Sequence, residues 1–347
     1  MNRKDEHVKY AMDTKKSKGA NDFDKIRFIH HGFSEQSVSE IDLSTHLMGI
    51  QFDTFFYINA MTGGSEWTAN INRDLATIAS RTNLAMATGS LSAAIKDSTF
   101  APSFRVVRDI LPQGIVFANM QASASYTNAQ KAIDIVKANA LQLHINHPQE
   151  LLMPEGDRDF KGWIENVAEL VKKIKLPIMI KEVGFGMSKE TIEQCVNLSV
   201  AAIDISGRGG TNFALIENIR SIYPMSYMDD WGQSTVLSLL EAQDFVDKID
   251  IVASGGIRHP LDMIKSLALG AKAVGISGTI LHSLLEVGID ATVDMIERWK
   301  MECTYIMTAL GAKNIQELRR CAMIFDDSLY SVAMQRNLSF EHIPLRR

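Results

Sequence analysis

The sequence predicts an α/β protein that folds as a (β/α)8 TIM barrel with an N-terminal extension and C-terminal helices. Three features predict this fold: eight short apolar runs, amphipathic segments between them, and a small or polar residue at the end of every run. Continuously apolar strands that alternate with helices are typical of a buried parallel sheet, and eight such units favour closure into a barrel. A doubly wound open sheet is the alternative.

The apolar runs have the length of buried strands, and the segments between them carry helix signals. Residues 161–174 place apolar side chains at the i, i+3, i+4, i+7 spacing of an amphipathic helix. Ser188 is expected to cap the next helix, and Pro260 to open a helix that closes on Gly270. The eight expected strands span residues 54–59, 84–88, 115–119, 141–146, 177–182, 201–206, 249–254 and 271–277.

The chain is expected to divide into an N-terminal extension and a barrel. Residues 1–50 are mostly polar and precede the first apolar run, so we expect them to cap the active site. Residues 51–347 are expected to form the barrel. Within it, residues 288–347 have a helical pattern and are expected to complete the last βα unit and a C-terminal cap.

The composition is typical of a soluble globular protein and argues against several classes of partner. The formal net charge is −5 and basic residues are spread along the chain, so no nucleic-acid partner is expected. No apolar stretch approaches the ~20 residues that span a bilayer, and the charged N-terminus lacks the apolar core of a secretory signal. Three widely separated cysteines fit neither a disulfide framework nor a zinc site, which indicates free thiols in a reducing cytoplasm.

The ends of the eight strands predict a ligand site. In barrels of this kind the active site lies at the C-terminal ends of the strands. A purely structural barrel needs turn glycines at some ends, but not small or polar residues at all eight. The residues at these ends are Met61-Thr62-Gly63, Ser90, Asn119, His144 with Asn146, Lys181, Ser206 with Thr211, Gly255-Gly256-Ile257-Arg258, and Ser277-Gly278.

The last two strand ends and Lys181 each have a functional interpretation. Gly255 and Gly256 let backbone N–H groups approach phosphate oxygens, and Arg258 adds a charge-assisted hydrogen bond. The alternative is a tight turn followed by a surface arginine. Lys181 is interpreted as a cation that faces an electron-rich ligand, such as a reduced flavin, or as an imine-forming amine. The alternative is a lysine whose stem lies along the barrel rim.

His144, Asn146, Gln149 and Glu150 form the most unusual cluster. His144 and Asn146 lie two apart on an expected strand and so face the same side, and Gln149 and Glu150 follow in the expected loop. Glu150 can hold Mg²⁺ if a substrate diphosphate supplies the other oxygen ligands. Taken alone, Glu150 is better interpreted as a solvated loop charge.

The N-terminal segment carries three basic residues that can contact a ligand. Arg3 and His7 share one face if the segment is helical, and with Lys4 they can fold over the barrel mouth and bind anionic oxygens. The alternative is a disordered tail. We expect residues 1–10 to be unordered until substrate binds.

Several motifs together resemble the type 2, FMN-dependent isopentenyl-diphosphate isomerases. They occur in the family's order over nearly the whole chain, and the first two are the most specific. The loop at residues 91–94 lacks a basic residue that some family members carry. The motifs are RKDEH (3–7), HINHPQE with PEGDRDF (144–160), AMTGG (60–64), TGS (88–90), KEVG (181–184), SGRGGTNF (206–213), WG (231–232) and SGGIR (254–258).

The resemblance implies interconversion of isopentenyl and dimethylallyl diphosphate, without net redox change. It also implies reduced FMN, NADPH as reductant, Mg²⁺, and a homo-oligomer, either tetramer or octamer. The substrate is a small-molecule diphosphate.

The resemblance also implies roles for individual residues. Gln149 lies near the alkene with Glu217 as a supporting acid or base, and Glu150 binds Mg²⁺. The substrate contacts are Arg3, Lys4, His7, His144, Asn146 and Gln149. The FMN contacts are Ala60, Met61, Thr62, Gly63, Ser90, Asn119, Lys181, Ser206, Thr211, Gly255, Gly256, Ile257, Arg258, Ser277 and Gly278.

Two other functions remain open. A flavin-dependent 2-hydroxy-acid oxidase needs a histidine base and paired arginines, and the histidine in the segment directly after the seventh expected strand is His259, which follows GGIR. A barrel that binds a phosphate ligand without catalysis would lose only affinity when Lys181 or Gln149 is replaced.

Overall fold

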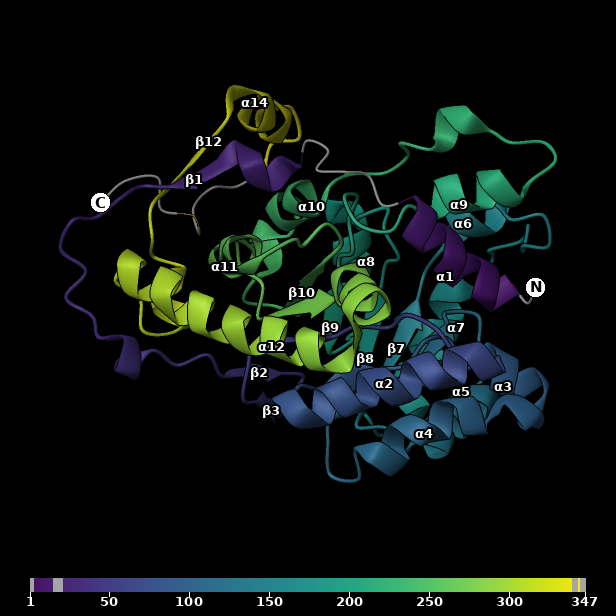
Figure 1. The fold of residues 1–347 in the computed structure, drawn as a ribbon. Coiled ribbons are helices and arrows are strands. Elements are labelled where there is room, and N and C mark those ends of the chain that lie inside the picture. The colour runs from purple at the N-terminus through teal and green to yellow at the C-terminus, as the bar shows by residue number, and fades with distance from the viewer. Residues whose placement is uncertain (1–2, 15–20, 339–342, 344–347) are drawn as a thin grey trace.

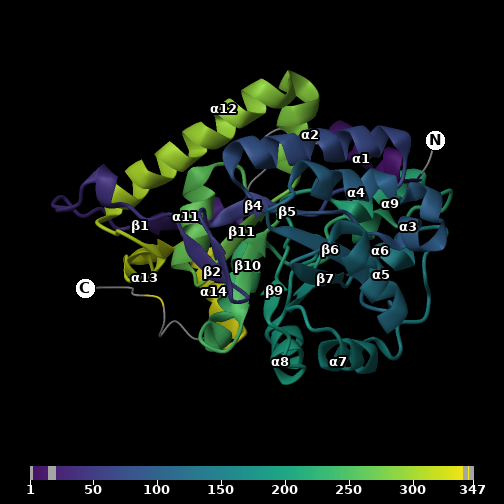
Figure 2. The same cartoon turned by 90° about the horizontal axis from the view of Figure 1, so that it is seen from below.

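The structure is a closed barrel of eight parallel strands surrounded by helices (Figures 1 and 2). It is a computed structural model that describes residues 3–14, 21–338 and 343. The strands follow one another around the barrel in chain order, and the last strand, β11, pairs with the first, β4, to complete the ring. The predicted barrel is therefore confirmed, and the open sheet is wrong.

Each predicted strand corresponds to one barrel strand; most are shorter than predicted, but β6 extends two residues past the predicted end and β7 begins one residue before the predicted start. The barrel strands are β4 (Phe56–Ile58), β5 (Met86–Ala87), β6 (Val116–Gln121), β7 (Ala140–His144), β8 (Ile178–Lys181), β9 (Ala202–Asp204), β10 (Asp250–Ser254) and β11 (Ala273–Ile276). The longer helices are α1 (Arg3–Asp13), α2 (Glu66–Thr82), α4 (Pro102–Ile110), α5 (Tyr126–Val136), α7 (Trp163–Lys173), α8 (Lys189–Asn197), α9 (Phe213–Arg220), α11 (Pro260–Ala268), α12 (Gly278–Leu310) and α14 (Asp327–Gln335). Shorter helices are α3 (Ser92–Lys96), α6 (His147–Leu152), α10 (Thr235–Glu241) and α13 (Ile315–Leu318).

Local sequence signals set several helix boundaries as expected. The Ser188 side chain accepts a hydrogen bond from the Thr191 backbone N–H and caps α8. Pro260 begins α11, where its missing N–H costs no helical hydrogen bond. Gly270 follows the end of this helix with a φ of +105°, a conformation that favours glycine.

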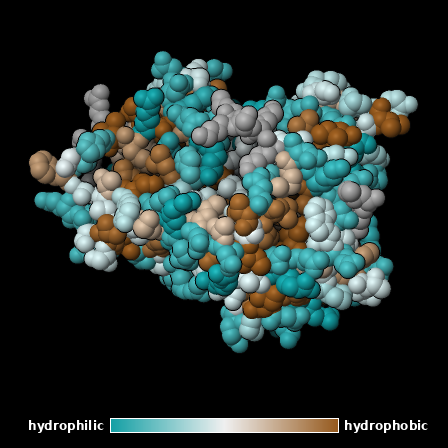
Figure 3. Space-filling view, in the orientation of Figure 1, coloured by the Kyte–Doolittle hydropathy of each residue, from teal (hydrophilic) through white to brown (hydrophobic). Residues whose placement is uncertain are grey.

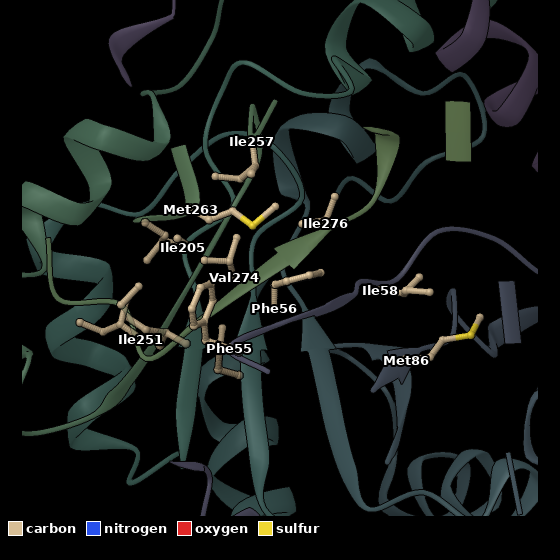
Figure 4. Close-up of a cluster of buried hydrophobic side chains, with 14 of the residues drawn as sticks. Phe55, Phe56, Ile58, Met86, Ile205, Ile251, Ile257, Met263, Val274 and Ile276 are labelled. Atoms are coloured by element: carbon tan, nitrogen blue, oxygen red, sulfur yellow. The ribbon is translucent and has the colours of Figure 1, made fainter. Parts of the chain in front are cut away.

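The apolar core has two parts. The larger part lies between the strands and the surrounding helices, and Figure 4 shows a portion in which Ile251 and Val274 of neighbouring strands lie near Met263 of α11. The smaller part fills the lower interior of the barrel, where the rings of Tyr57 and Phe117 lie 5.6 Å apart. This apolar filling leaves the upper interior, toward the C-terminal strand ends, to polar side chains.

Two small sheets outside the barrel were not predicted. A hairpin of β2 (Thr45–Leu47) and β3 (Ile50–Phe52) packs Phe52 against Tyr57 and Phe117, so it closes the lower end of the barrel. The predicted boundary at residue 50 falls inside this hairpin. In the second sheet, β1 (Ile26–Phe28) pairs with β12 (Met323–Phe325), which joins the two ends of the chain.

Helix α1 lies beside α2 and α9, at the barrel end that carries the C-terminal strand ends (Figure 1). Its Val8 side chain is buried, which anchors the helix. The expectation that residues 1–10 stay unordered until substrate binds remains a prediction. Within the described ranges, no helix is both long enough and apolar enough to cross a membrane.

Candidate active site

The residues predicted from the strand ends all lie at one end of the barrel. Lys181 and His144 are the last residues of β8 and β7, and Asn119 lies in β6. The loops after β4, β5, β9, β10 and β11 carry the remaining predicted contacts, and α1 crosses the same end. Parallel strands thus bring together side chains that are far apart in sequence.

Gln149 and Glu150 lie on a short helix, which corrects the prediction that they belong to a loop. β7 ends at His144, and Asn146 is the residue that precedes α6 rather than part of the strand. Pro148 in the first turn favours the helix at this point. Both Gln149 and Glu150 are consequently buried, with exposed fractions of 7% and 8%. Glu150 is therefore not a solvated loop charge.

A buried carboxylate, Glu217, joins three elements of the site. Its Oε1 accepts a hydrogen bond of 2.9 Å from Gln149 Nε2 of α6 and lies 3.0 Å from His7 Nε2 of α1. Burial raises the pKa of Glu217, but interactions with His7, Gln149 and Arg220 outweigh burial and hold this pKa below its usual value. Glu217 is therefore an ionised base beside a neutral amide.

His7 and Lys4 approach this carboxylate from α1. Burial lowers the pKa of His7 despite the neighbouring Glu217, so the imidazole is neutral near pH 7. Desolvation, together with repulsion from Arg3, lowers the pKa of Lys4 to about 8, while Glu217 and Glu150 act in the opposite direction. A bound anion would favour the charged form of Lys4 and regain part of the free energy lost to desolvation.

Glu150 is held in place by three donors. Its Oε1 accepts hydrogen bonds from Asn146 Nδ2 at 2.9 Å and Gln121 Nε2 at 3.2 Å, and its Oε2 accepts one from the Asp157 backbone N–H at 2.9 Å. The carboxylate retains lone pairs for a cation, since each oxygen can accept more than one bond. The described residues contain no group of three or more His, Cys, Asp or Glu side chains able to hold a metal. Glu150 thus fits the role of one ligand to a metal whose other ligands come from substrate or water.

Lys181 is not a rim lysine but half of a buried ion pair. Its Nζ donates to Asp204 Oδ2 at 2.8 Å, and the exposed fractions of the two side chains are 7% and 0%. Asp204 also accepts from Asn59 Nδ2 at 2.7 Å and Ser254 Oγ at 2.6 Å. The pair therefore holds a fixed cation at the C-terminal end of β8.

Asp204 was missed as a site residue, although the sequence contained a signal. It is the one charged residue in the apolar run at 201–206, and a charge in a buried strand needs a partner. Gln142 was also missed. Gln142 joins the Asn119 side-chain amide to the same network. Its Oε1 accepts a hydrogen bond from Asn119 Nδ2 at 3.2 Å, and its Nε2 donates one to Asn59 Oδ1 at 3.2 Å.

His144 is neutral and has a defined tautomer. Its Nδ1 lies 2.8 Å from Asn119 Oδ1, and because an amide oxygen can only accept, Nδ1 carries the hydrogen. Burial, with repulsion from Lys4 and Lys181, lowers the pKa of His144 to about 3. His144 can therefore offer Nε2 as an acceptor but not a positive charge.

The glycines after β10 have a structural reason as well as the expected functional one. A Cβ on Gly255, whose φ is +87°, would lie 2.1 Å from the Gly207 carbonyl oxygen, so the loops after β9 and β10 touch through their backbones. Arg258 binds Asp24 and Asp262 through its guanidinium, with distances of 2.7–3.0 Å. It thereby ties this loop to the N-terminal segment.

One predicted FMN contact has an unsatisfied polar atom. Thr62 is 2% exposed, and within the described part of the chain its Oγ1 has no hydrogen-bond partner. A buried hydroxyl without a partner is costly, so a ligand that bonds to it would be stabilised. Together with the buried Lys181 cation, Thr62 shows that this end of the barrel fits an anionic, hydrogen-bonding ligand.

A hollow of about 450 Å³ lies at the opposite end of the barrel, where the strands begin. Asp250, Lys272 and Arg319 are among its lining residues. None of the predicted site residues lines it, and Lys272 is paired with Asp250. This hollow is separate from the candidate active site.

Comparison with known proteins gives two further findings. A family model described as FMN-dependent dehydrogenase matches residues 129–324. The isopentenyl-diphosphate delta-isomerase of Staphylococcus saprophyticus is 48% identical over 97% of this chain and 97% of its own length. The enzyme of the same name from Latilactobacillus sakei is 46% identical, again over 97% of both chains.

Solved structures share the fold at low sequence identity. A mutant flavocytochrome b2 with benzoylformate has a TM-score of 0.67 and 20% identity, over 95% of this chain and 84% of that one. A lactate oxidase from Pediococcus acidilactici has a TM-score of 0.65 and 16% identity, over 92% of this chain and 86% of that one. At this level of identity the likeness concerns the barrel alone.

Proposed function

Because this chain belongs to the FMN-dependent dehydrogenase family and to the isopentenyl-diphosphate delta-isomerases, we propose that it interconverts isopentenyl and dimethylallyl diphosphate with reduced FMN. The observation that carries the proposal is the contact of Glu217 with Gln149 and His7, at the barrel end that also holds Lys181. An ionised base, a neutral amide, the buried Lys181 and the partly buried Lys4 at one mouth suit proton transfer to and from an anionic substrate.

FMN is proposed to bind against Lys181, with Thr62 and the loops after β10 and β11 as further contacts. When bound, reduced flavin supplies an electron-rich ring that stabilises developing positive charge and a proton site at N5. Asp204 fixes the position of the Lys181 ammonium, so its charge is already oriented before a ligand arrives. The N-terminus of α12 contacts the loop after β10, where Thr279 Oγ1 donates to the Ile257 carbonyl oxygen at 2.8 Å, and its dipole would favour the phosphate.

The diphosphate is proposed to bind Arg3, Lys4 and His7 of α1, with Mg²⁺ between the diphosphate and Glu150. Lys4 and Glu150 interact across the same space, which supports a site for an anion and a cation together. Asn146 and Gln121 orient the Glu150 carboxylate, and oriented carboxylates lose less entropy when a metal binds.

Glu217, which is ionised, is proposed to accept the proton that leaves the substrate when dimethylallyl diphosphate forms, and to return it in the reverse reaction. Gln149 is an amide and a poor proton carrier, so it positions the substrate and Glu217 rather than acting as the acid. His7 of α1 is neutral and lies beside the same Glu217 oxygen. We propose that this contact keeps α1 over the site and so excludes water from it.

We further propose NADPH as the reductant, a homo-oligomer such as a tetramer or octamer, and a location in a reducing cytoplasm. The described cysteines are free, which supports the last point. The segment after α9 exposes Ile222, Tyr223 and Tyr227 by more than 80% each, and part of the hydrophobic surface at the upper right of Figure 3 lies in this region. An exposed apolar patch supports contact between subunits.

The function is tested by incubating the FMN-loaded protein anaerobically with isopentenyl diphosphate, Mg²⁺ and dithionite, and by measuring dimethylallyl diphosphate. Product should form, should require reduced FMN and should be lost when EDTA removes Mg²⁺. Oxidation of a 2-hydroxy acid at a rate that matches flavin reduction would support the oxidase instead. Binding of the diphosphate without conversion would support the non-catalytic barrel.

A further inference from the structure

Arg220 binds three carboxylates that come from three different segments. On its own helix, α9, it pairs through Nη1 with Glu217 Oε2. Its Nε lies 2.9 Å from Glu6 Oε2 of α1, and its Nη2 lies 2.7 Å from Glu155 Oε1 in the segment after α6. The Arg220 and Glu217 side chains are 11% and 0% exposed, so water screens this pair weakly, whereas Glu6 and Glu155 are 30% and 42% exposed and their pairs are screened more.

The planar guanidinium is suited to this arrangement because each of its three nitrogens can donate in a different direction. A lysine ammonium at the same position is a point charge and cannot reach three separated carboxylates with the same geometry. Without a cation here, Glu6, Glu155 and Glu217 would be like charges in close proximity, and their repulsion would favour separation of α1 from α9.

Other described contacts of α1 lie on both sides of Glu6, among them the buried Val8 and the contact of the His7 ring with Phe213. Ser65 Oγ donates to Asp5 Oδ1 at 2.6 Å, and Arg3 lies 3.9 Å from Glu155 in an exposed pair. Glu6 is next to His7, which contacts Glu217, so the Glu6–Arg220 pair fixes α1 at the point where it meets the base.

We propose that Arg220 is a positioning residue that holds Glu217 toward Gln149 and, through Glu6 and Glu155, holds α1 and the 153–162 segment closed over the active site. It does not contact the reacting atoms. It couples closure of the barrel mouth to the placement of the base. The kinetic part of this inference rests on the proposed function, but the structural part does not.

The structural part is tested by hydrogen exchange of the FMN-loaded protein. In Arg220→Gln, amides in residues 3–13 and 153–162 should exchange on the order of tenfold faster, as expected for loss of one charge-assisted hydrogen bond. Exchange in the barrel strands should not change. Arg336→Gln is the matched control, because Arg336 also joins two carboxylates, Glu190 and Glu241, away from the mouth. It should leave exchange in residues 3–13 unaltered.

The kinetic part is tested with variants that separate the two roles of Arg220. The double variant Glu6→Gln and Glu155→Gln keeps the Arg220–Glu217 pair, so KM for isopentenyl diphosphate should rise about tenfold while kcat changes by less than about twofold. Arg220→Gln should raise KM and also lower kcat by about tenfold or more. Arg220→Lys keeps a charge beside Glu217 and should recover most of kcat but not KM.

Unchanged exchange of residues 3–13 in Arg220→Gln would overturn the inference, as would an unchanged KM in the double variant. Faster exchange throughout the barrel would also overturn it, because it would indicate a general loss of stability. If the wild-type protein has no isomerase activity, the proposed function fails, whereas hydrogen exchange still decides whether Arg220 holds α1 closed.

Discussion

Breaking the Lys181–Asp204 pair should destabilise the barrel by several kcal/mol. The two side chains are buried, and removing one partner of a buried ion pair costs about 3–5 kcal/mol, because the other charge is left uncompensated. In Lys181→Met, Asp204 keeps donors from Asn59, Ser254 and the Ser206 backbone, so we expect the lower end, about 3 kcal/mol. In Asp204→Asn, the buried ammonium loses the carboxylate that lies 2.8 Å away, and the cost should approach about 5 kcal/mol.

The assay is the urea midpoint of unfolding of the flavin-free protein at fixed protein concentration, so that neither ligand binding nor subunit association alters the comparison. The double variant Lys181→Met with Asp204→Asn should be less destabilised than the sum of the single variants by about 2 kcal/mol. Lys173→Met removes an exposed pair with Glu169 and should change stability by less than about 1 kcal/mol. A Lys181→Met protein as stable as the wild type, or single effects that simply add, would refute the reasoning.

Three further outcomes are expected. Glu217→Gln should lower kcat about 10²–10⁴-fold, the usual contribution of a general base, with the fold intact by circular dichroism; undiminished kcat would remove Glu217 from proton transfer. Because the pKa of Lys4 is lowered to about 8, kcat/KM should fall above about pH 8 as Lys4 loses its proton, and Lys4→Arg should move that decline to higher pH; an unmoved decline would assign it to another group. Gly255→Ala should weaken FMN binding and destabilise the protein by about 3 kcal/mol, whereas Gly162→Ala, in the left-handed region with a φ of +79° and no described atom within 4 Å of the new Cβ, should cost about 1 kcal/mol; equal effects would show that backbone contact at Gly255 is unimportant.

The fold was predictable because the barrel depends on local patterns. Each strand is a short apolar run with a small or polar residue at its end, and chain order is also spatial order in this fold. β12 and the β2–β3 hairpin were not predicted, since three-residue strands carry almost no periodicity and their pairing depends on distant partners.

The site was predictable to the extent that strand ends converge. Lys181, Asn119 and His144 follow from that rule, and the ionisable Asp204 was visible as a charge within an apolar run. The role of Arg220 was not predictable, because its partners Glu6 and Glu155 lie on other segments and no spacing relates them. The burial of Glu150 depended on a short helix that sequence pattern did not indicate.

The most direct test of the account is isomerisation in deuterated water under anaerobic conditions, with Mg²⁺ and FMN reduced beforehand by dithionite. Proton transfer at the barrel mouth without net redox change predicts dimethylallyl diphosphate that carries deuterium, while the flavin absorbance stays that of the reduced form over many turnovers. Flavin that becomes oxidised in step with substrate consumption, or substrate recovered unchanged beside fully reduced bound flavin, would contradict it.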